Sequence, residues 1–536
     1  MLESSRQPED TYLVWTRFTY PDKDGPIDAV AVPNWVATYL TSGYSMLISL
    51  MMAQVWSILV GLVIFYHLRK SNMRPSALHP IAPTLWNRRA DLVTSMIETF
   101  GFRGFHCRYM WEIGVFVLIL AAWVGQTVVG ITVPGSLILG NAAPVRPESI
   151  YVADPENRPR DLTAFSLEVP PALRALGRTE QPTQEIRGKV LLDEEDIGRT
   201  EAGEEILQFR YSYTVTGADM GLQKYPNLSL SVTGSCHTEY GWLNRTDEDS
   251  QTDEYALFNN TVPVSPHLDG NQPTANFVLG PPSEGSSNWT FGIIVSSAHR
   301  ISYTPSTDPW YLTEYLESRT GANHSVRAGR PPLSCWQDDK WSYKGRTSTI
   351  LNLTSAALPG LELSRDMQDV LAVRLIVPMI WQLGRHVQSS ALKSATTSNE
   401  RIFDAGASSI KSDLDRLLFA TYIYTANVLS DMTLYPVESR SSEKLSNFAR
   451  KKSGEVKDEI AGFVVFTPDV TAVSVAVLVT IPCVVIVVWI LAVVLVFFTP
   501  VGVVNALDSN NMHQELAKHY VDATVKYGGE GAVWEM

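Results

Sequence analysis

Three long stretches of this chain carry no charged side chain, and they constrain its fold more than any other feature. No Asp, Glu, Lys or Arg occurs in residues 29–68, 113–133 or 470–507. A helix needs about 20 apolar residues, at a rise of about 1.5 Å each, to cross a bilayer, and each stretch contains such a run. Helices buried in soluble cores are the alternative, but they rarely stay uncharged on every face for so long.

These runs predict a membrane protein with three transmembrane α-helices, at residues 44–66, 113–133 and 470–498. The remaining chain then falls into four segments: residues 1–43, 67–112, 134–469 and 499–536. The N-terminus is polar and acidic, without a basic region leading into a short apolar stretch and a cleavage site. No cleavable signal peptide is therefore expected, and the first span serves as the targeting signal.

The distribution of basic residues predicts the orientation. Residues 67–111 carry seven Lys or Arg against two acids, whereas residues 1–34 carry three against six. Short basic loops stay in the cytoplasm, so the N-terminus and residues 134–469 are expected outside and the C-terminal tail inside, at the plasma membrane or an endomembrane. The basic sequence "ARKKSGEVK" before the third run favours the reverse, but long domains translocate largely regardless of charge.

The exported segment carries two further marks of an extracytoplasmic domain. All six Asn-x-Ser/Thr glycosylation sequences lie within it, at Asn227, Asn244, Asn259, Asn288, Asn323 and Asn352. It also contains two of the four cysteines, Cys236 and Cys335, which are expected to form one disulfide in an oxidising compartment. Closing a loop of about 100 residues contributes about 4.7 kcal/mol in the chain-entropy account.

An α+β fold is predicted for this ectodomain, with a β-rich first part and a helical second part. From about residue 186 to 355, sequences such as "QFRYSYTVTG" alternate apolar and polar residues, as strands do. After Pro359 apolar residues recur at spacings of three and four, which indicates helices. Residues 134–185 are expected to form an irregular lead-in, and "TLWNRRADLVTSMIETF" predicts an amphipathic helix in the cytoplasmic loop.

No catalytic residue, metal site or cofactor is predicted. "SCHTEYGW" has the H-x-E spacing of zinc deaminases, but the downstream P-C-x-x-C is missing, which leaves His237 and Glu239 as polar flanks of the disulfide. Acids beside aromatic residues occur in sugar-binding clefts as well as in ordinary disulfide-anchored loops. A candidate binding surface near the disulfide therefore comprises Trp242, Trp336, Asp338, Asp339 and Trp341.

The widely spaced "SCHTEYGW" and "LSCWQDDKW", together with "LLFATYIYTANVLSDMT", resemble features of uncharacterised multi-pass membrane proteins of filamentous fungi. The resemblance is one of layout over most of the chain, with early spans, a large glycosylated segment and a late span. It implies an architecture and no activity.

The sequence favours an integral membrane glycoprotein whose ectodomain serves recognition, sensing or scaffolding. Its expected partners are the lipid bilayer, a protein or glycan bound by the ectodomain, and further copies of itself through the spans. Nucleic acid is not expected, because the exported segment holds 31 basic and 42 acidic residues. Two alternatives stay open: a glycan hydrolase using Asp338 and Asp339, and an oligomeric channel or transporter subunit using Gln54 or Gln126.

Overall fold

The chain folds into two compact units, which are described separately. The computed structural model describes residues 8–70, 110–154, 168–180, 187–266, 268–270, 272–281, 288–317, 322–399, 402–435, 447–451 and 453–498. The amphipathic helix predicted in the cytoplasmic loop and the tail 499–536 lie outside these residues. The helix unit comprises Val32–Gly140 and Thr471–Met536, and the sheet unit comprises Met1–Ala31 and Asn141–Val470.

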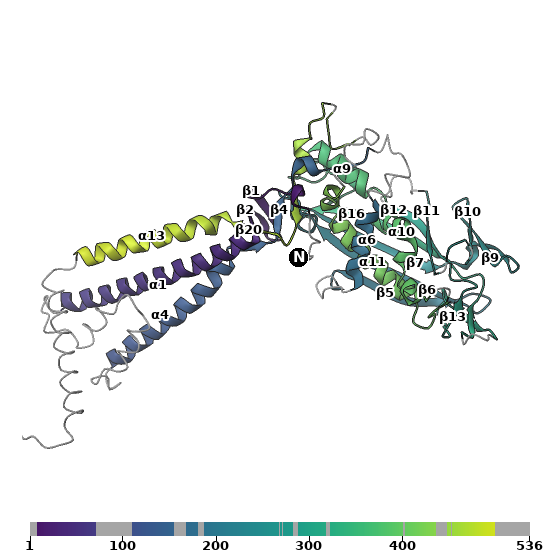
Figure 1. The fold of residues 1–536 in the computed structure, drawn as a ribbon, viewed down its shortest axis with the longest axis horizontal. Coiled ribbons are helices and arrows are strands. Elements are labelled where there is room, and N and C mark those ends of the chain that lie inside the picture. The colour runs from purple at the N-terminus through teal and green to yellow at the C-terminus, as the bar shows by residue number, and fades with distance from the viewer. Residues whose placement is uncertain are drawn as a thin grey trace, which may run out of the picture. The chain divides into compact units, whose positions relative to one another are not determined.

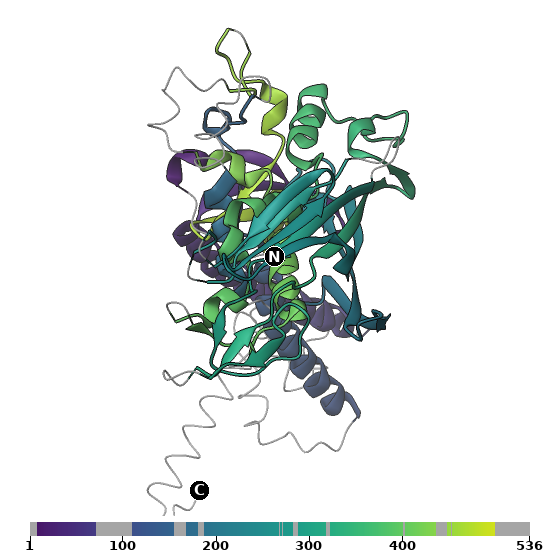
Figure 2. The ribbon, with the colours of Figure 1, turned by 90° about the vertical axis from the view of Figure 1, so that its right-hand side faces the viewer.

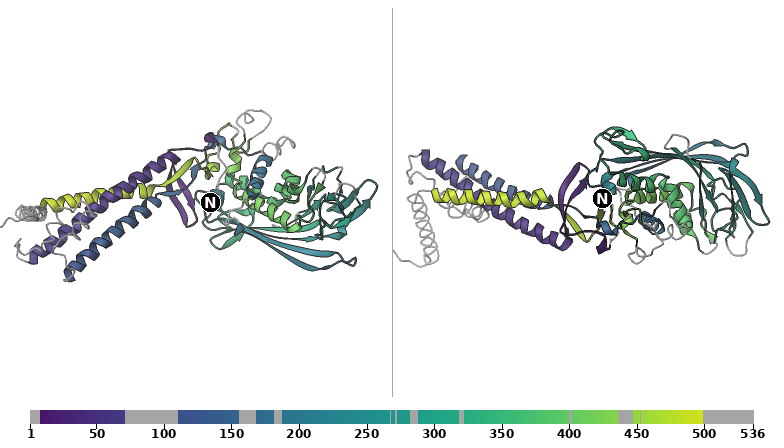
Figure 3. Two further views of the ribbon diagram at one scale, coloured as in Figure 1. Left: turned by 60° about the horizontal axis from the view of Figure 1, so that its bottom comes forward. Right: turned by 90° about the horizontal axis from the view of Figure 1, so that it is seen from above.

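The helix unit consists of three apolar helices that lie side by side (Figures 1 and 3). They are α1 (Asn34–Lys70), α4 (Met110–Gly135) and α13 (Val475–Phe498), and α1 contacts both of the others. The Tyr44 hydroxyl of α1 donates a hydrogen bond of 2.6 Å to the Leu478 carbonyl of α13. Further along, a side chain at Gly61 would collide with the Leu495 side chain, so this glycine permits the close approach of the two helices.

Two helices in the described part of the chain are long and apolar enough to cross a membrane, Asn34–Tyr66 and Val475–Leu495. The apolar segment of α4, Leu120–Gly135, is shorter, so the third span stays a prediction. The sheet unit contains a pair of consecutive helices, Arg365–Leu375 and Met379–Thr397, that is long and apolar enough to cross a membrane only when counted as one segment. The two helices are bent by 57° relative to each other.

The ends of the apolar helices differ from those expected. The first helix begins at Asn34, ten residues before the predicted start, where the Asn34 side chain accepts a hydrogen bond from Thr471. The last helix begins at Val475, because Val470–Ser474 forms strand β20 and pairs antiparallel with β3 (Ile138–Gly140). A short apolar, β-branched run can form either a helix or a strand, and pairing with a distant segment decides between them here.

A seven-stranded antiparallel sheet forms the centre of the sheet unit (Figures 1 and 2), in the order β11-β12-β16-β7-β6-β5 with β17 paired to β16. Its strands are β5 (Val190–Arg199), β6 (Glu205–Thr216), β7 (Ser229–Thr238), β11 (Ala275–Leu279), β12 (Asn288–Val295), β16 (Leu333–Tyr343) and β17 (Arg346–Ser348). Alternate residues of a strand point to opposite faces. In β6, Leu207, Phe209, Tyr211, Tyr213 and Val215 are buried on one face.

Helices cover that buried face of the sheet, as Figure 3 shows. They are α6 (Val169–Gly177), α10 (Met379–Val387) and α11 (Ile410–Ala426); α11 contacts β5 and β6, and α10 contacts β11. The Tyr422 ring of α11 meets the Tyr213 ring edge-on at 6.2 Å. We call this the covered face and the other the open face. The prediction of strands in the first part of residues 134–469 and helices in the second part is confirmed in part, because the main sheet precedes α10 and α11 but α6 precedes the sheet.

Shorter elements complete the sheet unit. A three-stranded sheet contains β8 (Leu243–Asp247), β9 (Thr252–Leu257) and β10 (Asn260–Val264). A four-stranded sheet contains β13 (Ile301–Ser302), β14 (Thr313–Tyr315), β15 (His324–Val326) and β18 (Ile402–Phe403). The remaining elements are the hairpin of β1 (Arg17–Asp22) and β2 (Gly25–Pro33), the pair β4 (Ala142–Pro144) and β19 (Val464–Phe466), and the helices α8 (Gly217–Met220) and α9 (Arg365–Leu375).

The expected irregular lead-in, residues 134–185, is wrong for the residues of this segment that the structure describes. Ala142 and Ala143 are fully buried in β4, which pairs with β19 more than 300 residues later. Tyr151 stacks on Tyr435 at 4.5 Å, and α6 packs against α11. These contacts join segments that are far apart in the sequence, so no local pattern of apolar residues predicts them.

Candidate functional site

The structure divides the predicted binding surface, because two of its neighbouring acids lie on opposite faces of the sheet. In β16, Trp336 and Asp338 lie on the open face, whereas Asp339 and Trp341 lie on the covered face. Asp338 forms an ion pair of 2.7 Å with Lys340. A glycosidase needs two carboxyl groups flanking one bond, and adjacent strand residues cannot supply them. Asp338 and Asp339, the two acids that suggested a glycan hydrolase, therefore lie on opposite faces of β16.

Asp339 is half-buried on the covered face, where it belongs to a polar cluster. Its carboxylate accepts a hydrogen bond of 2.8 Å from the Gln337 amide, whose oxygen in turn accepts one of 2.9 Å from the Tyr211 hydroxyl. Burial raises the pKa of Asp339 to about 7, and the nearby charge of Asp338 adds to the increase. Asp339 is thus part of a hydrogen-bonded network on the covered face.

The structure contains the disulfide between Cys236 and Cys335, which lie directly opposite each other on β7 and β16. Both cysteines are buried on the covered face. His237 lies on the open face, 3.4 Å from Glu239, whose carboxylate accepts a hydrogen bond of 2.8 Å from the Gly241 amide. Glu239 thus stabilises the turn that follows β7.

Trp242 belongs to a separate hydrophobic cluster. Its ring meets Phe258 edge-on at 5.4 Å, and both pack against buried Tyr255, Leu257 and Ile294. This cluster packs on the open face itself, because a side chain at Gly292, which lies opposite Ser334 on that face, would meet the Trp242 ring. The five residues of the predicted surface are therefore divided between two faces: Trp242, Trp336 and Asp338 lie on the open face, and Asp339 and Trp341 lie on the covered face.

Two further carboxyl groups are enclosed near the start of α11. Asp413 accepts hydrogen bonds from the Tyr311 hydroxyl at 2.5 Å and the Ser394 amide at 2.9 Å, and burial raises its pKa to about 6. Asp308 accepts one of 2.9 Å from the Ile410 amide, and burial raises its pKa to about 7. Both satisfy buried donors, and Asp308 caps the first turn of α11. Among the described residues, no group of three or more His, Cys, Asp or Glu is placed to hold a metal ion.

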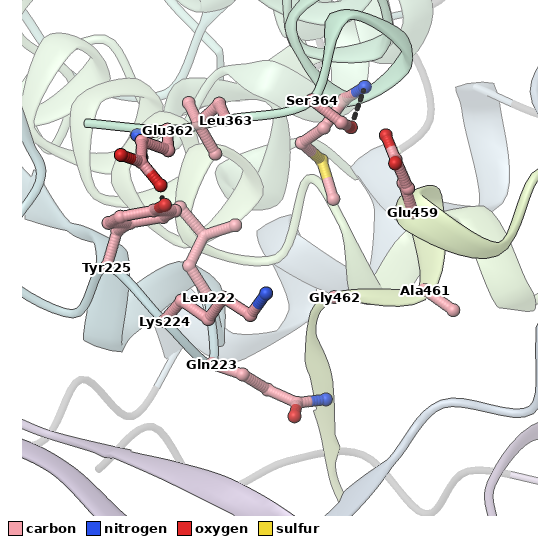
Figure 4. Close-up of a pocket in the computed structure, with 11 residues that line it drawn as sticks. Leu222, Gln223, Lys224, Tyr225, Glu362, Leu363, Ser364, Glu459, Ala461 and Gly462 are labelled. Carbon is pink, nitrogen blue, oxygen red and sulfur yellow. Dashed lines mark hydrogen bonds between the residues drawn. The ribbon is translucent and has the colours of Figure 1, made fainter. Parts of the chain in front are cut away.

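A pocket of about 460 Å³ lies elsewhere in the sheet unit (Figure 4). Three segments that are distant in sequence line it: residues 222–225 after α8, residues 362–367 at the start of α9, and residues 459–462. Its apolar lining includes Leu222 and Met367, both buried. None of its segments carries a recognisable sequence motif, so the sequence alone does not indicate this pocket.

Hydrogen bonds and an ion pair hold the three segments together. Gly221 has a φ of +84°, and its carbonyl accepts a hydrogen bond of 2.8 Å from the Val464 amide; a side chain there would meet the Val464 carbonyl. The Tyr225 hydroxyl accepts a hydrogen bond of 3.1 Å from the Glu362 amide. An ion pair of 2.9 Å joins Lys457 to Asp366 in the first turn of α9. These contacts fix the positions of the three segments that line the pocket.

Charged side chains line this pocket without neutralising one another. Figure 4 shows Glu362 and Glu459 at opposite sides of it, with Lys224 contributed by the third segment. Among the described residues, neither carboxylate nor the Lys224 ammonium forms a hydrogen bond or ion pair. The Gln223 amide, by contrast, donates to the Phe463 carbonyl at 3.1 Å and is occupied. The pocket therefore offers two anionic groups and one cationic group to a ligand.

Comparison with known proteins gives one match. The model of a family described as "Domain of unknown function (DUF8406)" matches residues 169–465, more than half of the chain. No curated protein and no solved structure matches the chain. The matched span contains the seven-stranded sheet, the disulfide and every residue that lines the pocket, and it contains none of the helix unit.

Proposed function

We propose, from the premise that this chain belongs to the family described as a domain of unknown function (DUF8406), that it is a membrane-anchored recognition glycoprotein. Its ligand is a small zwitterion, such as an amino acid or a short peptide, bound in the pocket of the sheet unit. The observation that carries this proposal is the gathering of Lys224, Glu362 and Glu459, none of them in an ion pair within the described structure, around one cavity.

The pocket's chemistry supports this ligand class. Its volume of about 460 Å³ lies in the range of small-molecule sites. An ammonium group of the ligand would bind Glu362 or Glu459, and a carboxylate would bind Lys224, in charge-assisted hydrogen bonds that are stronger than neutral ones. Leu222 and Met367 would contact the ligand's apolar part. Two carboxylates against one ammonium favour a ligand whose net charge is zero or positive.

The membrane assignment draws on the helices outside the matched domain. Two helices long and apolar enough to cross a membrane, Asn34–Tyr66 and Val475–Leu495, flank the domain in sequence. We propose that α4 is a third span, that the N-terminus and sheet unit lie outside, and that the tail is cytoplasmic. The basic loop and the sequons support this orientation. Five sequon asparagines are exposed, whereas Asn323 is half-buried, with its side-chain oxygen enclosed.

Ligand binding is testable with the full-length protein in detergent micelles. Isothermal titration with the standard amino acids and a set of dipeptides should identify a zwitterion that binds. Lys224→Met, and at least one of Glu362→Gln and Glu459→Gln, should weaken that binding by about tenfold or more, because a lost charged hydrogen bond costs about 1.5–3 kcal/mol. Glu248→Gln, a change at an exposed acid outside the pocket, should leave binding unchanged.

The proposal fails if no member of the panel binds at millimolar concentration, or if the three pocket variants bind as the native chain does. Orientation has a separate test. An endoglycosidase should increase the electrophoretic mobility of the protein made in a glycosylating host, and an unchanged mobility would refute the exported sheet unit.

A further inference from the structure

The open face of the seven-stranded sheet displays one large aromatic side chain among hydroxyl groups. Trp336 is 46% exposed at the middle of β16. Thr290 of β12 and Ser235 of β7 lie directly opposite it on either side, and Thr233 lies opposite the next open-face residue, Asp338. No ring or cation contact involves the Trp336 indole within the described residues. An exposed indole in this setting suits a partner that is apolar on one side and hydrophilic on the other.

The register of β12 brings one glycosylation sequon beside this indole. In the sequon Asn288-Trp289-Thr290, Asn288 lies opposite Asp338 and Thr290 lies opposite Trp336. Asn288 and Trp336 are therefore diagonal neighbours on the same face, a relation that places Cα atoms about 7–8 Å apart and within reach of an aromatic side chain. The other five sequon asparagines all belong to the described residues, and none of them lies on a strand of this sheet.

We infer that Trp336 is the packing surface for an N-linked glycan carried by Asn288. The first sugar, N-acetylglucosamine, is joined to the asparagine amide nitrogen and presents C–H groups on the faces of its ring and an acetamide methyl group. The flat indole can contact these groups, while the exposed hydroxyl of Thr233 can hydrogen-bond the sugar's hydroxyls.

The occupant of this surface is thus part of the same glycoprotein rather than a separate partner. Its apolar contact shields the exposed indole, and its bulk covers the neighbouring open face, which reduces the association of exposed apolar surfaces. The inference rests on the proposed exported orientation, because only that orientation makes Asn288 available for glycosylation. It is independent of the pocket and its ligand.

The test measures how Trp336 protects the glycan on Asn288. The full-length protein is produced in a glycosylating host, and the occupancy of each sequon is determined by mass spectrometry of its peptides. The native protein is then digested with a peptide-N-glycosidase, and the rate of release is followed at Asn288 and, for comparison, at Asn244. Trp336→Ser should accelerate release at Asn288 by about twofold to tenfold, the range given by an aromatic contact of about 0.5–1.5 kcal/mol, and leave Asn244 unchanged.

Leu191→Ser is the matched control, because Leu191 is 59% exposed on β5 of the same sheet and pairs with open-face Ser212. It should leave the release rate at Asn288 unchanged. A second readout is thermal stability: Asn288→Gln should lower the Tm of the native chain and have no effect in the Trp336→Ser background.

Three results would overturn the inference. Equal release rates at Asn288 in the Trp336→Ser variant and in the native chain exclude the contact. An Asn288 that is unoccupied while other sequons are occupied also excludes it and leaves the orientation intact. If no sequon is occupied, the exported orientation itself fails, and the inference fails with it.

Discussion

Asp339 provides the sharpest test of how the sheet unit is stabilised. Its carboxyl group is enclosed with Gln337, Tyr211 and Tyr213, and burial raises its pKa from 3.8 to about 7. Between pH about 4 and about 7, Asp339 therefore stays protonated in the folded chain, whereas it is ionised in the unfolded chain. Stability falls as the pH rises through this window, because the folded state binds more protons there. At 1.36 kcal/mol per pKa unit, the total loss is about 4 kcal/mol.

The substitution Asp339→Asn removes the ionisation and keeps an oxygen that can accept the hydrogen bond from Gln337. About 3 kcal/mol of the loss falls between pH 5 and pH 8. At about 2 °C per kcal/mol for a large domain, the Tm of the native chain should fall over this interval by about 6 °C more than that of the variant. The other enclosed acids, including Asp308 and Asp413, titrate in both proteins, so their contributions cancel in the difference.

The assay is thermal unfolding of the full-length protein in detergent at pH 5 and pH 8. Asp338→Asn is the matched control, since Asp338 is adjacent in sequence but lies on the open face in an ion pair with Lys340. It should change Tm by about 2 °C or less at either pH, because such ion pairs contribute about 0–1 kcal/mol. The same pH dependence in Asp339→Asn and the native chain would refute the reasoning.

Three further predictions concern single elements of the sheet unit. Cys335→Ser should lower the free energy of unfolding by about 3–5 kcal/mol, measured by denaturant titration, and an unchanged midpoint would show that the disulfide contributes nothing. Gly234→Ala should cost about 1–3 kcal/mol, because the new methyl group would meet the Tyr211 ring; a native Tm would show that the ring moves freely. Ser409→Ala removes the side chain that accepts a hydrogen bond from the Ser412 amide and should cost about 1 kcal/mol; thermal unfolding that shows no loss of stability would contradict that capping role.

The pairing of Cys236 with Cys335 and the order of the main strands before α9–α11 were predictable from local signals. Cys236 has one other cysteine in the same segment, and the alternation in β6 directly reflects the period of an extended backbone. The candidate site was not predictable in the same way. Proximity in sequence suggested that Asp338 and Asp339 act together, but the same period of two places them on opposite faces of β16.

By itself, the sequence determined which segments are apolar enough for a membrane, where strands give way to helices, and which cysteines can pair. These properties depend on composition and on backbone periods that each segment carries locally. The tertiary structure alone decided that β4 pairs with β19, that Lys224, Glu362 and Glu459 line one pocket, and that Asn288 lies beside Trp336. Each of these depends on the partner and register of a distant segment, which no local pattern specifies.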